Sequence, residues 1–172
     1  MFVQLKKSTK SSSSRFVLLL VLLATILLLL GGCRSKSKPE KRIKKVKEGN
    51  LELSVAVNKG DFKAGKEIPI TISVKNVSQE IEFLHYHTEQ RFDLEVKDSK
   101  GKAIWRWSQG SFFGLVKVQI KMEPDESEES DVIWPQKDSA GNQVPPGKYT
   151  LIAKSMADET TKTLSIDVKT VK

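Results

Sequence analysis

Few side chains in this sequence could carry out catalysis. It holds only two histidines, His85 and His87, and a single cysteine, Cys33. A nucleophilic triad needs a nucleophile, a histidine base and an acid within mutual reach. The sequence has no Gly-x-Ser-x-Gly motif, and no glycine-rich phosphate loop follows an expected strand and opens a helix. We therefore expect no enzymatic activity and no cofactor.

The two histidines could instead be metal ligands. They are two residues apart, so they share one face of an expected strand. A zinc site requires three or four ligands, and the nearby Glu89 and Asp93 are not convincing partners. The acidic run over residues 123–131 lacks the glycine and the spacing of a calcium loop. We expect no metal site, and we interpret both segments as solvated surface.

Cys33 is distinguished by its position. Residues 1–15 carry four basic side chains and no acid, and residues 16–30 are apolar apart from Thr25. A positive start, an apolar run and small residues before a cleavage point are typical of a secretory signal. The alternative is a transmembrane anchor, but residues 16–32 are at the lower limit of the roughly 20 apolar residues that a spanning helix needs. The pattern favours a signal peptide over residues 1–32.

The residues Leu30-Gly31-Gly32-Cys33 resemble the lipobox of bacterial lipoprotein precursors, in which the cysteine thiol receives a diacylglycerol and the chain is then cut before it. The resemblance implies that acylated Cys33 anchors the chain in membrane lipid, on the extracytoplasmic face of the cell membrane. Two acyl chains would hold it firmly, because each buried CH₂ contributes about 0.8 kcal/mol. With one cysteine, no internal disulfide can brace the folded part.

The formal net charge of +8 is concentrated beside this predicted anchor. Residues 34–48 carry eight basic and two acidic side chains, whereas residues 49–172 carry 17 basic and 19 acidic ones. The positive charge is therefore no sign of a nucleic-acid-binding domain. We expect residues 33–48 to be the lipidated cysteine and a disordered basic linker. The linker is either attracted to anionic lipid, at about 1 kcal/mol per basic residue, or a plain spacer.

From residue 51 onward, apolar and polar side chains alternate, which predicts strands with one buried face. Turn signals such as Asn58-Lys59-Gly60-Asp61 separate these segments, and no helical period is sustained after Gly49. About eight or nine short strands predict an all-β fold over residues 49–172, an immunoglobulin-like two-sheet antiparallel β-sandwich. The expected core residues are Leu51, Leu53, Val55, Val57, Ile68, Ile70, Ile72, Val74, Phe92, Leu94, Val96, Trp105, Trp107, Val116, Val118, Ile120, Met122, Trp134, Tyr149, Leu151, Ala153, Leu164, Ile166 and Val168.

Between residues 70 and 155 a series of short elements recurs in a recognisable order. They are Val74-Lys75-Asn76-Val77-Ser78, Gln90-Arg91-Phe92-Asp93, Gly101-Lys102-Ala103-Ile104-Trp105-Arg106-Trp107-Ser108, Glu123-Pro124-Asp125-Glu126-Ser127 before Trp134, and Pro145-Pro146-Gly147-Lys148-Tyr149-Thr150.

This series resembles the BsuPI family, known as intracellular proteinase inhibitors. The Trp-Arg-Trp-Ser and Pro-Pro-Gly-x-Tyr elements are the most specific. Phe92 stands where the family usually has tyrosine, and Asp125 stands where a Pro-Gly turn is usual. The resemblance implies a β-sandwich that binds a serine protease, which we expect to be of the subtilisin type. The alternative is an adaptor lipoprotein that docks another envelope protein without inhibiting a protease.

Two expected loops could enter a protease cleft. Residues 109–113 include Phe112 and Phe113 as apolar anchors, and residues 135–146 include Lys137. An inhibitory loop must be held extended by a rigid scaffold, because a preformed loop loses less entropy on binding. Either loop could equally be a passive connection. Phe112, Phe113 and Lys137 are the candidate partner-binding residues.

Overall fold

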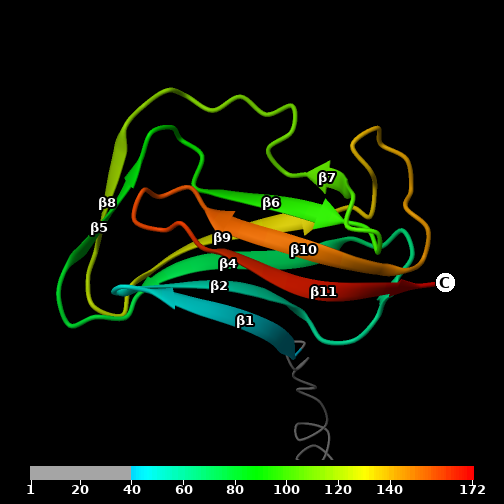
Figure 1. Ribbon diagram of the computed structural model, residues 1–172, viewed down its shortest axis with the longest axis horizontal. Helices are drawn as coiled ribbons and strands as arrows, with labels where there is room; N and C mark the ends of the chain where they lie inside the picture. Colours follow the sequence, from blue (N-terminus) through cyan, green and yellow to red (C-terminus); the bar gives the residue numbers. More distant parts are fainter. Residues whose placement is uncertain (1–39) are drawn as a thin grey trace, which may run out of the picture. The chain divides into compact units, whose positions relative to one another are not determined.

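The computed structural model describes residues 40–172, and these form an all-β fold without a helix (Figure 1). It has eleven strands rather than eight or nine, because the count includes the unexpected first strand and the two-residue β3. The strands are β1 (Lys41–Glu48), β2 (Leu51–Asn58), β3 (Phe62–Lys63), β4 (Ile68–Asn76), β5 (Glu82–Tyr86), β6 (Phe92–Lys97), β7 (Ala103–Arg106), β8 (Val118–Met122), β9 (Ser127–Trp134), β10 (Lys148–Ser155) and β11 (Thr163–Val171).

Two sheets face each other in the expected sandwich. One has the strand order β1-β2-β4-β9 and the other has the order β3-β11-β10-β6-β7. All their pairs are antiparallel except β3 with β11. Strands β5 and β8 form a separate two-stranded arm at one end of the sandwich (Figure 1). The predicted fold class is therefore confirmed.

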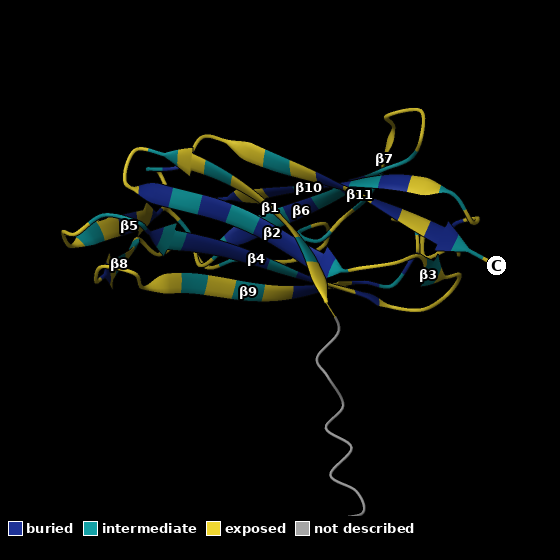
Figure 2. Ribbon diagram, turned by 90° about the horizontal axis from the view of Figure 1, so that it is seen from below, coloured by how far each residue is buried: buried dark blue, intermediate teal, exposed yellow. Residues whose placement is uncertain are grey.

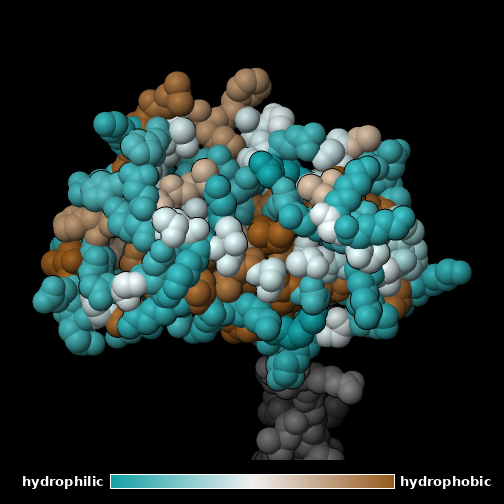
Figure 3. Space-filling model, viewed as in Figure 1, coloured by the Kyte–Doolittle hydropathy of each residue, from teal (hydrophilic) through white to brown (hydrophobic). Residues whose placement is uncertain are grey.

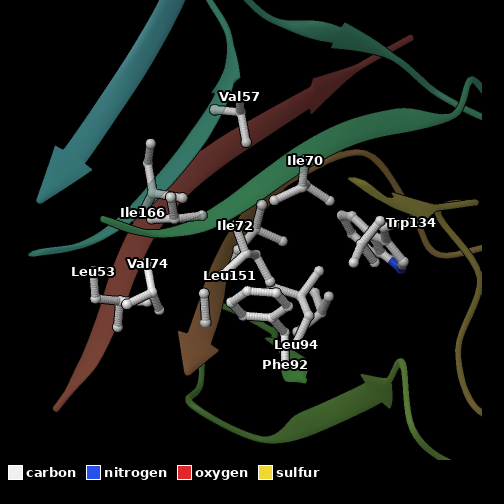
Figure 4. Close-up of a cluster of buried hydrophobic side chains, with 14 of the residues drawn as sticks. Leu53, Val57, Ile70, Ile72, Val74, Phe92, Leu94, Trp134, Leu151 and Ile166 are labelled. Carbon is white, nitrogen blue, oxygen red and sulfur yellow. The ribbon is translucent and has the colours of Figure 1, made fainter. Parts of the chain in front are cut away.

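The core lies between the two sheets, where the alternating apolar residues meet. The four expected core residues of β2 and the four of β4 are each at most 3 % exposed. Leu94 of β6, Leu151 of β10 and Ile166 of β11 face them from the other sheet (Figure 4). Each such side chain stabilises the folded state by about 1.5–3 kcal/mol when fully buried, so this core is the main source of stability in a chain that has only one cysteine.

The three tryptophans differ in burial. Trp134 is fully buried, as expected, and its ring meets that of Tyr149 edge to face at 5.1 Å between centroids. Trp105 and Trp107 pack against the core but stay partly exposed. The prediction that this pair belongs to the core is therefore met only in part, because β7 is the edge strand of its sheet and ends at Arg106, before Trp107.

Residues 41–48 are not a disordered linker, contrary to the prediction. They form β1, which pairs with β2 in an unbroken register from Lys41 with Asn58 to Glu48 with Leu51. The strand is mostly exposed (Figure 2), so its order comes from backbone pairing rather than burial. Gly49, with φ of 59°, opens the two-residue turn, as in a type II′ hairpin. A lysine-rich edge of this kind also discourages pairing with another chain.

The element Val74-Lys75-Asn76-Val77-Ser78 is explained by Asn76, whose side chain is fully buried. Its amide donates to the carbonyls of Glu80 and Met122, and its oxygen accepts from the backbone N–H of Ser78. The neighbouring turn places Asp125 at φ of 65°, a conformation that favours glycine. Asp125 therefore adopts a left-handed conformation at the point where the sequence departs from the Pro-Gly pattern.

The signal peptide over residues 1–32, the acylation of Cys33 and the linker up to residue 39 lie outside the described residues. Within residues 40–172, no helix is long and apolar enough to cross a membrane.

Candidate functional site: an exposed apolar loop

The connection between β7 and β8, residues 107–117, presents large apolar side chains to solvent. We call it the apolar loop. Phe112 is fully exposed, Leu115 is 90 % exposed and Val116 is 54 % exposed. Hydrophobic atoms gather along the upper edge in Figure 3, where Figure 1 draws this loop. A cluster of large exposed apolar groups on a folded domain typically marks an interaction site.

Phe112 and Phe113, predicted together as apolar anchors, have different environments. The ring of Phe113 is only partly exposed and lies against Trp107, with 5.7 Å between the ring centroids. Trp107 is itself held, because its backbone N–H donates to the carbonyl of Leu94 on β6 at 2.9 Å. Phe113 therefore fastens the apolar loop to the domain, while Phe112 remains free to contact a partner.

Glu89, from the connection between β5 and β6, holds Gly114 of the apolar loop through two hydrogen bonds. Its backbone N–H donates to the carbonyl of Gly114 at 3.1 Å, and its carboxylate accepts from the N–H of Gly114 at 3.2 Å. A side chain at position 114 would place its Cβ 2.9 Å from that carboxylate. Any other residue at this position would make the end of the Glu89 side chain shift from its present place.

The beginning of the loop is held by a tight turn. The backbone N–H of Gln109 donates to the carbonyl of Arg106, and that of Ser111 donates to the carbonyl of Ser108. The side chain of Gln109 accepts from the hydroxyl of Ser139 at 2.5 Å. The chain is thus fixed on both sides of Phe112, although residues 111–117 belong to no strand.

The second predicted loop, residues 135–146, is shaped by a buried glutamine. Gln136 is fully buried, and its φ of 55° is unusual for a residue with a side chain. Its amide donates to the carbonyls of Lys63 at 2.8 Å and Lys66 at 2.6 Å, and its oxygen accepts from the N–H of Gly65 at 3.2 Å. The side chain therefore ties this loop to the turn after β3.

Lys137 follows Gln136, and its side chain is exposed. Its carbonyl accepts from the indole N–H of Trp134 at 3.1 Å. Further along, backbone hydrogen bonds from Asn142, and also from Ala140, hold the pKa of the Asp138 carboxyl below its usual value. The loop meets the apolar loop through Ser139, whose hydroxyl donates to the side-chain oxygen of Gln109.

Each histidine pairs with an acid from the connection between β10 and β11. His85 Nδ1 lies 2.5 Å from Glu159 Oε1, and His87 Nε2 lies 3.1 Å from Asp158 Oδ2. Burial acts to raise the pKa of Glu159, but hydrogen bonds from the backbone N–H and ring of His85 outweigh it, and the pKa is lowered. Residues 40–172 contain no cluster of three or more His, Cys, Asp or Glu suited to a metal ion.

Sequence reasoning missed Leu115 and misplaced Val116, which was expected on the buried face of a strand. The strand β8 begins only at Val118, so Val116 remains outside the sheet. The signal was present, because residues 112–116 are all apolar or glycine and break the alternation of period two. Glu89 gave no signal, because its role depends on a contact 25 residues away in sequence.

The similarity to solved structures is weak. A β-glucosidase from Erythrobacter marinus covers 76 % of this chain at 13 % identity and a TM-score of 0.41, and this chain spans only 16 % of its length. A second match is a CARDB domain from Pyrococcus furiosus in complex with di-metal ions, at 13 % identity and a TM-score of 0.35. It includes 78 % of this chain and 90 % of the CARDB domain. A third match is an alkylpurine DNA glycosylase from Pseudomonas fluorescens, at 12 % identity and a TM-score of 0.39. It includes 85 % of this chain and 33 % of the glycosylase.

No curated protein sequence matches the chain. The model of the BsuPI family, described as intracellular proteinase inhibitor, matches residues 51–160. This match spans well over half of the chain and includes the apolar loop, the Trp-Arg-Trp-Ser element and the Pro-Pro-Gly-x-Tyr element. The chain therefore belongs to the BsuPI family of intracellular proteinase inhibitors.

Proposed function

We propose that this chain is a lipid-anchored, extracytoplasmic protein whose BsuPI domain binds and inhibits a serine protease of the subtilisin type. Family membership supports the inhibitor function. The observation that carries the proposal is the fully exposed side chain of Phe112, which projects from a loop whose backbone is fixed on both sides.

Inhibition by a loop requires rigidity more than chemistry. A flexible loop must be ordered on binding, at about 0.5–1.5 kcal/mol per immobilised side chain, whereas a preformed loop avoids most of this loss. Trp107 and Glu89 hold the apolar loop before any partner arrives. An exposed aromatic ring on such a scaffold is the kind of residue that dominates binding energy at protein interfaces.

The proposed anchor keeps the domain close to the bilayer. Because β1 begins at Lys41, only residues 34–40 separate Cys33 from the sandwich, and seven residues span at most about 25 Å. The basic side chains of β1 would then lie near anionic lipid, each contributing about 1 kcal/mol. The beginning of β1 and the apolar loop lie on opposite sides of the sandwich (Figure 1), which favours a loop that points away from the membrane.

Inhibition is tested by titrating the full chain, purified in detergent, against a subtilisin-type protease. We expect protease activity to fall in proportion to added protein until one equivalent is present. Unchanged protease activity at a large excess of the chain would rule out this function. Mass spectrometry of the membrane-extracted protein tests the anchor, which requires a diacylglycerol on Cys33 and the absence of residues 1–32.

The second candidate is an adaptor that docks an envelope protein without inhibiting a protease. It is favoured by a separate apolar surface on the arm, where Ile81 is 45 % exposed and Phe83 is 41 % exposed. Crosslinking in cells distinguishes the two functions, because an adaptor would be recovered with a protein that has no protease activity.

A further inference from the structure

We infer that Phe112 is the residue that determines specificity, with its ring entering the primary apolar pocket of the target protease and residues 111–113 lying across the active site as a substrate would. This inference rests on the proposed inhibitor function. It assigns Phe112 of the apolar loop to the primary specificity pocket of the protease, and it defines the chemical class of protease that the domain recognises.

The distribution of exposure singles out Phe112. A residue that fills a deep pocket must be free along the whole length of its side chain, and Phe112 is fully exposed. Its neighbour Phe113 is held on Trp107, and Val116 is only about half exposed. Leu115 is also highly exposed, but it follows the clamped Gly114 and lies three residues beyond Phe112.

Charge defines the class of pocket. Residues 107–116 carry no charged side chain, and Lys117 is the last residue of the loop, five residues beyond Phe112. The segment around Phe112 therefore offers nothing to a pocket that recognises lysine, arginine or an acid. A phenyl ring buries a large apolar area, and its natural complement is the hydrophobic slot of a chymotrypsin-like specificity pocket. The target is therefore a serine protease that accepts large apolar residues.

The segment after Phe112 explains how a substrate-like loop could remain bound. Phe113 is fixed by Trp107, and Gly114 is fixed by both hydrogen bonds to Glu89. A flexible substrate leaves the cleft as separate pieces, whereas this segment stays attached to the folded domain. We therefore expect the loop to dissociate slowly.

The test uses the full chain in detergent with three substitutions, Phe112→Ala, Phe112→Lys and, as the matched control, Leu115→Ala. Inhibition constants are measured against a subtilisin-type protease, chymotrypsin and trypsin. We expect Phe112→Ala to weaken inhibition of the apolar-specific enzymes at least about 30-fold, as for an interface hot spot, and Leu115→Ala to weaken it less than about 5-fold. Phe112→Lys should gain inhibition of trypsin, whose pocket ends in an aspartate.

Two results would overturn the assignment while leaving the inhibitor function in place. One is that Phe112→Ala inhibits as well as the unmodified chain, and the other is that Leu115→Ala has the larger effect. Failure of the unmodified chain to inhibit any of the three enzymes would instead remove the proposed function, and this inference with it. Thermal unfolding of each variant should be unchanged, because both side chains are exposed.

Discussion

The hydroxyl of Tyr149 donates a hydrogen bond to the carbonyl of Pro145, four residues earlier, at 2.5 Å. The same ring packs edge to face on Trp134 in the core. This contact resembles the tyrosine corner of immunoglobulin-like sandwiches, in which a tyrosine near a strand start bonds back to the preceding backbone. It gives the Pro-Pro-Gly-x-Tyr element a structural role, which is to fix the entry of the chain into β10.

Replacing Tyr149 by phenylalanine removes this hydrogen bond and keeps the ring. We expect Tyr149→Phe to lower the free energy of unfolding by about 1 kcal/mol, the usual net value of one such bond. The matched control is Tyr86→Phe, because the Tyr86 hydroxyl is buried and makes no hydrogen bond of ordinary geometry with any described residue, although Ser155 lies near enough to act on its pKa. Removing it should leave stability unchanged or raise it. Denaturant unfolding gives the stability of both variants. An equal loss of stability in the two would contradict a stabilising role for the hydrogen bond from Tyr149 to Pro145.

Both tyrosines of the chain should titrate abnormally. Burial, together with the charge of Glu128, raises the pKa of Tyr86 from 10.0 to about 12. Burial and the charge of Asp98 also raise the pKa of Tyr149. A raised pKa in the folded state stabilises the protein below pH 10, and this contribution is lost as the pH rises from 10 towards 12. Stability should therefore fall over this range.

The near-ultraviolet absorbance of tyrosinate measures the titration. We expect the folded chain to show no tyrosine ionising at the ordinary pKa, and the urea-unfolded chain to show both doing so. In Tyr149→Phe, the remaining transition should lie near pH 12. An ordinary tyrosine transition in the folded protein would contradict the burial of these groups.

Gln136 is expected to be among the most sensitive polar residues of the domain. Gln136→Ala would remove one hydrogen bond each from the carbonyls of Lys63 and Lys66 and from the N–H of Gly65. The Lys63 carbonyl would keep the bond that it accepts from the N–H of Lys66. We expect a loss of about 2–4 kcal/mol, since each buried group left unpaired costs about 1–3 kcal/mol and water can reach part of this site. Thermal or denaturant unfolding gives the value.

The neighbouring Lys137→Ala is the control for this substitution. Its side chain is exposed, so stability should change by less than about 0.5 kcal/mol. The same variant tests whether Lys137 binds a partner, because a weaker inhibition at unchanged stability would assign it that role. A similar loss of stability in both variants would show that the Gln136 hydrogen bonds contribute little.

The fold could be predicted because its main strands each bury one face. The alternating residues of β2 and β4 are fully or almost fully buried, and a period of two needs no other information. Strand β1 could not be found in this way. Ile43 is exposed and Val46 is only partly buried, so the strand exists through its backbone bonds to β2, which leave no apolar pattern in the sequence.

The candidate site could be predicted only in part, for a related reason. Composition identified Phe112 and Phe113 as apolar residues in a loop, but their different roles depend on Trp107, which covers one ring and not the other. Lys137 was chosen from its loop alone, and the structure shows an exposed side chain there. Contacts between distant segments decide such details, and a single sequence does not contain them.

Glu89 offers a test of whether loop rigidity matters for function. Glu89→Ala removes the carboxylate that accepts from the N–H of Gly114 and leaves the backbone bond between the two residues intact. We expect the Gly114 amide to exchange its hydrogen faster and inhibition to weaken about 3–10-fold, because the loop must then be ordered on binding. Glu89→Gln keeps an acceptor oxygen at the same position and should restore most of both properties. If Glu89→Ala speeds exchange at Gly114 without weakening inhibition, then rigidity of the apolar loop contributes nothing to binding, and the inhibitory contact must depend on Phe112 alone.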